Sequence, residues 1–215
     1  MYSSYTAASV AREYELAGKH GVRLEGALTW AFEFENQPYF AGFRVLASNG
    51  LDLPVLNVFR MFARMSGQRL TVQSSTGLDA ETIRNQGVRG HPDVSALASF
   101  DKTKLCVLVW HYHDDDLPGP DASVELTLDG LPFTNGRAQL TQYRIDANHG
   151  NSFEAWKRMG SPQPPAPAQY AQLEKAGQLA VFGTPETVPI NNGRAIIRLK
   201  LARQAVALLV LTRDK

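Results

Sequence analysis

Two carboxylates, Glu33 and Glu35, stand two residues apart shortly after a tryptophan, Trp30. In an extended strand such side chains point to the same face, so both carboxylates are expected on one side of the run 26–35. An indole ring stacks on the C–H face of a polyol, and carboxylates accept hydrogen bonds from its hydroxyl groups. The pattern suits polyol binding, and it also suits the solvated face of a half-buried strand with Trp30 in the core.

A second cluster holds His111, His113 and Asp114 at the end of an apolar run. The two imidazoles are expected on the same side of a strand, where a following carboxylate could complete a divalent-metal site. No third ligand follows at a fixed spacing, so we predict no metal site. Two interpretations stay open: a polar loop that caps the strand, or a loop that shapes a cleft or a domain contact.

A third polar group precedes the aromatic residues Phe153 and Trp156, and it comprises Arg144, Asp146, Asn148, His149 and Asn151. Such a loop could bind a ligand, but Arg144 and Asp146 also fit a structural salt bridge, which we favour. The sequence contains no Gly-x-Ser-x-Gly elbow, phosphate-binding glycine loop or dinucleotide fingerprint. We therefore expect neither a serine hydrolase nor a nucleotide cofactor.

Charge and hydropathy exclude several classes of partner. The 215 residues carry 22 Lys plus Arg against 21 Asp plus Glu, a net charge of +1, which disfavours nucleic acid or an anionic membrane as a main partner. No run approaches the roughly 20 apolar residues of a membrane helix, and residues 1–26 lack a signal-peptide pattern. The chain is expected to be soluble, and cytoplasmic if Met1 is the natural start.

The elements that must position these residues change along the chain. Periodicity predicts a helix over 4–19, a strand over 26–35 and a helix from Pro54 to Gly67. Beyond Gly67 the period shortens to two residues, which is typical of an antiparallel sandwich. The predicted strands are 69–74, 94–100, 104–113, 123–128, 137–146, 179–182, 195–201 and 205–212, and a short helix is predicted over 168–176.

Several stretches resemble a known family: Ala27 to Phe34, Pro38 to Arg44, Asn49-Gly50 and Pro54 to Phe62. Together they resemble the last barrel strand and helix of a glycoside hydrolase family 39 β-xylosidase. The stretches 109–121, 143–151 and 156–165 resemble the same family's C-terminal β-sandwich. The resemblance implies a mixed α and β fold, with the last helix-strand-helix portion of a TIM barrel (residues 1–66) followed by an antiparallel β-sandwich accessory domain (residues 67–215).

The resemblance also implies a retaining hydrolase of β-linked xylosides. In that family an acid/base glutamate stands in an Asn-Glu-Pro motif, and a nucleophilic glutamate ends the seventh strand, their carboxyl groups about 5 Å apart. Here the nearest triplet is Asn36-Gln37-Pro38, and the nucleophile's strand is expected before Ser3. Both catalytic glutamates are thus expected to be missing and the chain inactive alone.

By the same resemblance, Trp30 corresponds to a sugar platform and Glu33 or Glu35 to a carboxylate that binds sugar hydroxyls, while His111, His113 and Asp114 would lean toward the barrel mouth. The implied ligand is xylose or a xylo-oligosaccharide, without a cofactor. An isolated strand 27–34 would lack neighbours, so self-association or an upstream barrel half is expected to cover it. The alternative is a carbohydrate-binding or structural β-sandwich module without catalysis.

Overall fold

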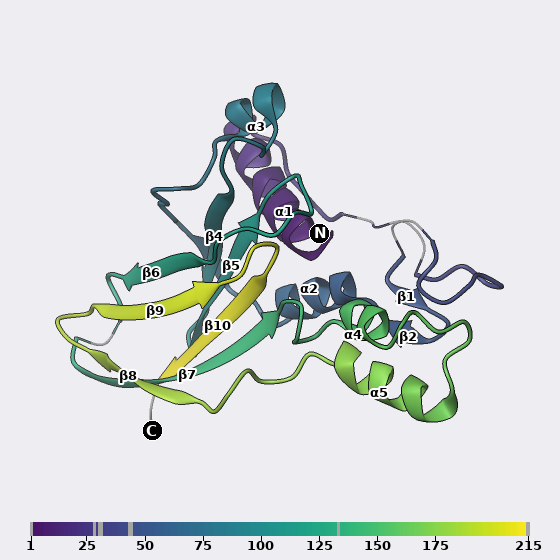
Figure 1. Cartoon of the computed structure of the whole chain (residues 1–215). Helices are drawn as coiled ribbons and strands as arrows, with labels where there is room; N and C mark the ends of the chain where they lie inside the picture. The colour runs from purple at the N-terminus through teal and green to yellow at the C-terminus, as the bar shows by residue number, and fades with distance from the viewer. Residues whose placement is uncertain (1, 28, 30–31, 43–44, 133, 214–215) are drawn as a thin grey trace.

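A computed structural model of the chain describes residues 2–27, 29, 32–42, 45–132 and 134–213. Its main sheet is formed by six strands, β3 (Gln68–Leu70), β4 (Asp93–Phe100), β5 (Lys104–Tyr112), β7 (Gly136–Ile145), β8 (Glu186–Ile190) and β10 (Val206–Arg213). They are ordered β3-β4-β5-β10-β7-β8, and every pair is antiparallel (Figure 1). A second antiparallel sheet pairs β6 (Ala122–Leu128) with β9 (Ala195–Leu201). The predicted mixed α and β class with antiparallel sheets is confirmed.

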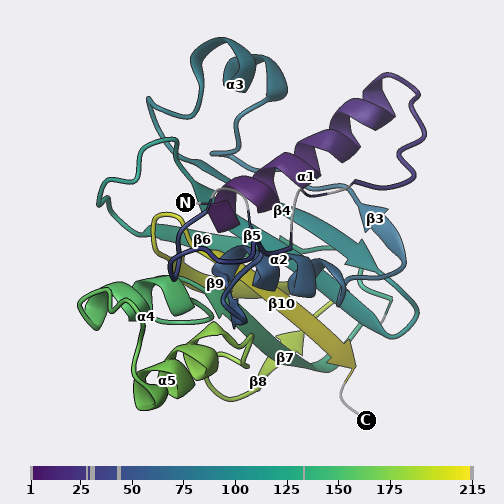
Figure 2. The ribbon, with the colours of Figure 1, turned by 90° about the vertical axis from the view of Figure 1, so that its right-hand side faces the viewer.

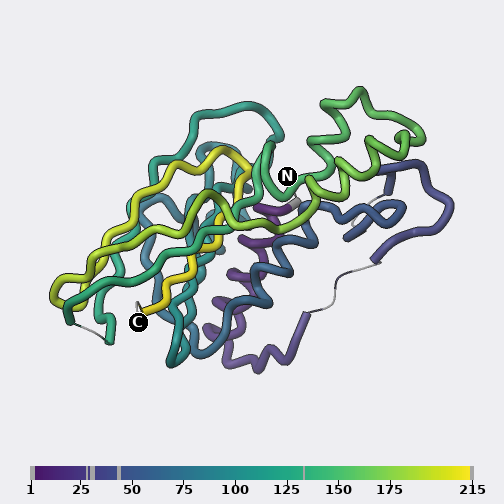
Figure 3. Tube along the Cα trace, turned by 90° about the horizontal axis from the view of Figure 1, so that it is seen from below, coloured from purple at the N-terminus to yellow at the C-terminus, as the bar shows by residue number. Residues whose placement is uncertain are grey.

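The remaining elements are five helices and a small hairpin within the described residues: α1 (Tyr2–Lys19), α2 (Pro54–Phe62), α3 (Ala80–Gln86), α4 (Ser152–Arg158), α5 (Pro167–Gly177), β1 (Ala47–Ser48) and β2 (Leu51–Asp52). Helices α1 and α2 cover one face of the six-stranded sheet (Figure 2). Helices α4 and α5 lie beside the β1-β2 hairpin (Figure 3). Over the described ranges, no helix has the length and hydropathy needed to cross a membrane.

The central strands of the main sheet are buried on both faces, and this explains why the sequence of strand β5 is apolar almost throughout. Leu105, Val107 and Val109 face the core shared with β6 and β9. The alternate residues, including Leu108 and Trp110, face the core shared with α1 and α2. Since successive side chains of a strand point to opposite faces, a strand covered on both sides requires an apolar residue at nearly every position.

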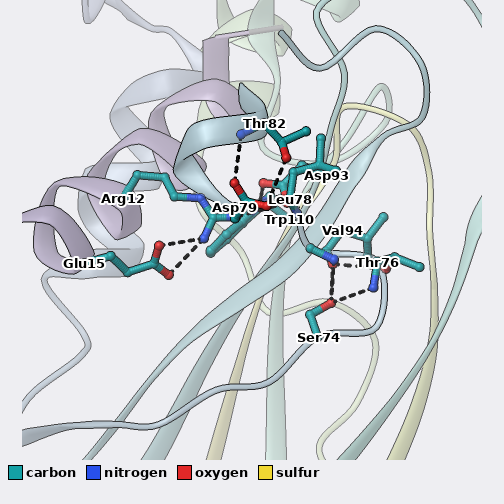
Figure 4. A network of polar contacts seen from close by, with 11 residues as sticks. Arg12, Glu15, Ser74, Thr76, Leu78, Asp79, Thr82, Asp93, Val94 and Trp110 are labelled. Atoms are coloured by element: carbon teal, nitrogen blue, oxygen red, sulfur yellow. Dashed lines mark hydrogen bonds and ion pairs between the residues drawn. The ribbon is translucent and has the colours of Figure 1, made fainter. Parts of the chain in front are cut away.

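A buried polar network joins α1 to the sheet (Figure 4). The Asp93 side chain on β4 is fully buried and accepts hydrogen bonds from the Trp110 indole N–H at 2.8 Å and the Leu78 backbone N–H at 2.8 Å. A guanidinium nitrogen of Arg12 on α1 lies 3.2 Å from the same carboxylate, and Arg12 also contacts Glu15 at 2.8 Å. The buried negative charge is thus paired and hydrogen-bonded, as burial requires.

The predicted strand over 26–35 is not formed in the described part of that range, and this prediction is wrong there. The Phe32 carbonyl accepts hydrogen bonds from the backbone N–H groups of Leu46 and Ala47, but no described strand runs alongside to form a ladder. Phe32 and Phe34 are 57% and 42% exposed instead of sharing a buried face. Alternation alone does not make a strand when no partner supplies hydrogen bonds.

Other elements also differ from expectation. The predicted strand 69–74 ends at Leu70 as β3, and helices α3 and α4 were not predicted. Helix α2 ends at Phe62 instead of near Gly67, where the chain turns close against the backbone of Phe100 to enter β3. The predicted strand 179–182 is reduced to a single bridge between Val181 and Tyr143. Strand β8 follows it and was not predicted.

Candidate functional site

The Glu33 carboxylate lies on the loop that leads to the β1-β2 hairpin. Its Oε1 atom accepts a hydrogen bond of 2.9 Å from the backbone N–H of Gly50, and its side chain is half-buried. Glu35 is exposed. Trp30, the predicted sugar platform, lies outside the described residues. Of the two predicted sugar-binding residues that the structure describes, Glu33 is therefore the one whose side chain the hairpin holds.

The turn that holds Glu33 is the residue pair Asn49-Gly50, with φ angles of 49° and 79°. Positive φ at both central residues is the requirement of a tight two-residue hairpin turn, which Asn-Gly satisfies best. The Tyr170 hydroxyl of α5 donates to the Asn49 carbonyl at 3.0 Å, and the Asn49 side chain donates to the Gln37 carbonyl at 3.1 Å. Burial raises the pKa of Tyr170, which keeps it a hydrogen-bond donor.

The loop before the hairpin is fastened to α4 by aromatic residues. The Phe40 ring lies 4.9 Å from the Trp156 ring and 5.9 Å from the Phe153 ring, measured between centroids. Tyr39 exchanges two backbone hydrogen bonds with the Gln163 side-chain amide, at 2.9 and 2.7 Å. These contacts, far apart in sequence, position the segment that carries Glu33.

A buried asparagine connects the two helical segments behind this site. Asn57 of α2 is fully buried and donates to the carbonyls of Gly150 at 3.0 Å and Gly177 at 2.7 Å. Gly150 precedes α4 and Gly177 ends α5, so a single amide group ties both helices to α2. Sequence reasoning did not single out Asn57, because both of its partners are backbone groups about a hundred residues away.

The second predicted cluster is held by backbone partners. His111 is 1% exposed and its Nδ1 lies 2.9 Å from the Leu201 carbonyl, while burial lowers its pKa. His113 Nδ1 accepts from the Asp115 N–H at 3.0 Å, and its Nε2 lies 3.1 Å from the Arg89 carbonyl.

Asp114 completes this strand end. It accepts hydrogen bonds from the Tyr112 hydroxyl at 2.7 Å and the Val88 N–H at 2.9 Å. Although its partial burial favours the neutral acid, these hydrogen bonds and the Arg89 charge lower the pKa of Asp114 overall. Within the described ranges, no three His, Cys, Asp or Glu side chains are grouped to hold a metal ion.

The third predicted group is arranged differently from expectation. Asp146 accepts hydrogen bonds from the backbone of Asn148 and His149 and pairs with His149 Nδ1 at 2.8 Å. Arg144 forms no ion pair within the described ranges, so the expected Arg144–Asp146 salt bridge is wrong. Its guanidinium instead lies 3.9 Å from the centroid of the Phe182 ring. The ring is thus in contact with this cation, and the Asp146 charge acts on Arg144 without forming an ion pair.

Comparison with known proteins agrees with the resemblance noted in the sequence. A sequence profile of glycosyl hydrolases family 39 matches residues 24–193. The fold is similar to that of a family 39 enzyme from Xanthomonas axonopodis pv. citri, with a TM-score of 0.73 and 19% identity over 99% of this chain and 41% of that one. A monomeric β-xylosidase from Caulobacter crescentus CB15 gives 0.71 and 16%, over 100% and 42%. The chain thus spans about two fifths of each relative's length.

Proposed function

Because the chain belongs to glycoside hydrolase family 39, we propose that it is the C-terminal portion of a β-xylosidase-like enzyme that hydrolyses β-linked xylosides with retention of configuration. Two matches together carry this proposal: the family profile matches residues 24–193, and the whole of this chain aligns with only about two fifths of a β-xylosidase. In this proposal both catalytic glutamates lie outside these 215 residues, and the chain alone does not turn over substrate.

The proposed division places residues 1–66 at the end of a TIM barrel and residues 67–215 in the accessory β-sandwich. Helices α1 and α2 then form the contact between the two parts, because Ala8, Ala11 and Met61 are buried against the sheet. The small alanine side chains let α1 approach the strands closely. The strand end of His111, His113 and Asp114 is proposed to lie on the same side, toward the barrel mouth.

The proposed sugar wall consists of Trp30, Glu33 and Glu35. Support comes from the way Glu33 is held: one carboxylate oxygen is occupied by the Gly50 N–H, which leaves Oε2 without a hydrogen bond among the described residues. A carboxylate fixed through one oxygen presents the other in a defined direction. It therefore binds a sugar hydroxyl at a lower entropic cost than a mobile, exposed carboxylate does. A xylose unit or a xylo-oligosaccharide is the proposed ligand.

The first test follows hydrolysis of an aryl β-xyloside by the purified 215-residue chain over long times. We expect no release above the uncatalysed rate. The control is the double variant Glu33→Gln, Glu35→Gln. Turnover by the native chain that disappears in this variant would mean that these carboxylates perform the chemistry, and the proposal that the catalytic glutamates lie elsewhere would be wrong.

The alternative function is a carbohydrate-binding or structural β-sandwich module without catalysis. It is favoured by one observation, the separate core that the six-stranded sheet forms with β6 and β9, which needs no barrel residue. Titration with xylose and xylobiose separates binding from structure. If the wall proposal holds, Glu33→Ala weakens binding about tenfold, the loss of one charge-assisted hydrogen bond. Equal affinity in this variant would remove Glu33 from the wall, and no binding at all would favour a structural module.

A further inference from the structure

A pocket of about 330 Å³ lies between strand β7, the loop that follows it and the segment around α5. This volume is within the range of small-molecule sites. The pocket lies on the side of α5 opposite the hairpin. Tyr170, Leu173 and Gly177 face the hairpin, whereas Gln172 and Lys175 line the pocket from the opposite side of a helix with 3.6 residues per turn. Ala176 lies at the border, since it packs against the hairpin cluster and also lines the pocket.

The charges that line this pocket are positive. Arg144 and Lys175 contribute cations and His149 an imidazole, and no carboxylate is among the lining residues. The nearest acid of the loop, Asp146, is already paired with His149 and with backbone N–H groups. An anion that enters the pocket would meet the cations of Arg144 and Lys175 and no carboxylate on the pocket wall, while the charges of Asp146 and Asp121 act on Arg144 from outside the lining.

Arg144 is the group that most needs a partner. Its Nε atom is buried and has no hydrogen-bond partner within the described ranges. A partly buried guanidinium without a hydrogen-bonded acceptor is costly, and a ligand carboxylate, which accepts two parallel N–H donors, is the complement it fits best.

An aromatic floor and three amide side chains accompany the charges. The Phe182 ring lies under the Arg144 guanidinium, and the His149 ring meets its edge at 4.9 Å. The Phe182 N–H donates to the Gln142 carbonyl at 2.7 Å, which fixes the backbone of Phe182 beside β7. Three amide side chains complete the lining, from Asn148, Gln172 and Gln178, and the last of these already donates to the Asp52 carboxylate at 3.5 Å and the Glu174 carbonyl at 3.4 Å. Amides of this kind suit hydroxyl groups.

The pocket is held together from behind. Asn57 bonds Gly150, a lining residue, and also Gly177, which ends the helix that carries Lys175. The Val181–Tyr143 bridge fixes the third wall to β7. A site whose walls are tied before the ligand arrives loses less entropy on binding.

We propose that this pocket binds one carboxylated sugar unit, a hexuronate, whose carboxylate meets Arg144 and Lys175 and whose hydroxyls meet the amide side chains. The saccharide part of this inference rests on the proposed function, while the anionic part rests on the charges of the pocket alone. No covalent step is involved. The site is separate from the Glu33 loop, since α5 lies between them.

The test is a calorimetric titration of the full 215-residue chain with glucuronate, glucose, acetate and inorganic phosphate at neutral pH and low salt. We expect glucuronate to bind, glucose and acetate to bind at least tenfold more weakly, and phosphate not to compete effectively. Lys175→Gln should weaken glucuronate binding roughly fivefold and Arg144→Gln more strongly. Lys200→Gln on exposed β9 is the matched control and should leave the affinity unchanged.

The outcomes are decisive in both directions. Lys175 is exposed, so its variant is expected to fold even if Arg144→Gln does not. Absence of glucuronate binding, or binding unchanged by Lys175→Gln, overturns the proposal. Phosphate binding as tightly as glucuronate would show a general anion site and overturn the sugar assignment. If glucuronate does not bind but xylose does, the pocket proposal is wrong and the proposed function stands. If glucuronate binds but xylose does not, the pocket proposal stands and the sugar wall does not.

Discussion

The hydrogen bond between Gly50 N–H and Glu33 gives the carboxylate a structural role that a substitution series can separate from sugar binding. Glu33→Ala removes the acceptor and should lower the free energy of unfolding by about 1 kcal/mol. Glu33→Gln keeps an acceptor oxygen at the same place and should be nearly neutral. Urea denaturation measures both, with the exposed Glu35→Ala as the control. A fully stable Glu33→Ala variant would mean that the turn does not depend on this carboxylate.

His111 predicts a pH dependence of stability. Burial lowers its pKa below the usual 6.5 of a histidine, with the Arg203 charge acting in the same direction and the Leu201 carbonyl and the Asp121 charge opposing it. The unfolded chain therefore takes up a proton near pH 6.5, while the folded chain does so only at lower pH. The unfolding free energy contributed by His111 is complete above about 6.5 and declines as the pH falls below it.

Denaturant titrations at pH 7.5 and 5.5 measure this effect. The native chain should lose more stability between the two values than a His111→Gln variant. His20→Gln, at an exposed position, is the control and should retain the native pH slope. An identical slope in the native chain and His111→Gln would contradict the prediction.

At the residue scale, the sequence identified the chemical groups better than their partners. The carboxylate at Glu33 was recognised as a hydrogen-bonding group from its type and spacing. Its partner Gly50 is 17 positions away, and their contact depends on a hairpin that the hydrophobic periodicity does not predict. The sequence did not predict that the pocket residues Lys175 and Phe182 lie near Arg144. The fold of α5 and the following segment brings them together, and the local sequence pattern does not indicate such a contact.

At the level of elements, the Asp93 network joins α1, β4, β5 and the loop before α3. Asp93→Ala leaves the Trp110 N–H, the Leu78 N–H and the Arg12 guanidinium without their shared acceptor. Arg12 keeps Glu15 as an ion partner, so the main cost is the two N–H donors left without an acceptor, each about 1–3 kcal/mol of stability.

Thermal or urea unfolding monitored by circular dichroism measures this loss. The control is Asp129→Ala, which breaks an ion pair with Arg194 whose two side chains are 59% and 60% exposed, and its unfolding midpoint should hardly move. Equal shifts for the two variants would contradict the distinction between a buried and an exposed pair.

Strands and helices could be predicted where burial leaves a hydrophobic pattern in the sequence. They could not be predicted where their formation depends on pairing with a distant strand. The run Lys104 to His113 was recognised because both of its faces are apolar, and the structure ends it one residue earlier. Strand β8 was missed because Pro189 argues against a strand. The structure tolerates that proline because β8 is an edge strand, where a missing N–H costs no ladder bond on the open side. The run 26–35 shows the converse, alternation without a partner.

For the whole molecule, apolar side chains exposed on α1 and the segment after it predict association. Tyr5 and Tyr14 on α1 are 48% and 44% exposed, and Val22 and Phe32 are 60% and 57% exposed. Contact with another chain would remove this apolar surface from water. We expect light scattering to show oligomers at moderate concentration, decreasing in a Val22→Ser, Phe32→Ser variant. A monomer at every concentration would contradict this expectation.

The six-stranded order has a consequence for the rate at which backbone amides take up deuterium. Strand β10 is bonded to β5 on one side and to β7 on the other, and its Leu208 and Leu209 side chains lie in opposite cores. Its amides can meet solvent only when the whole sheet separates, so their exchange reports global opening. The exposed edge strand β3 opens alone and exchanges early. Deuterium should therefore enter the sheet from its edges and reach β10 last.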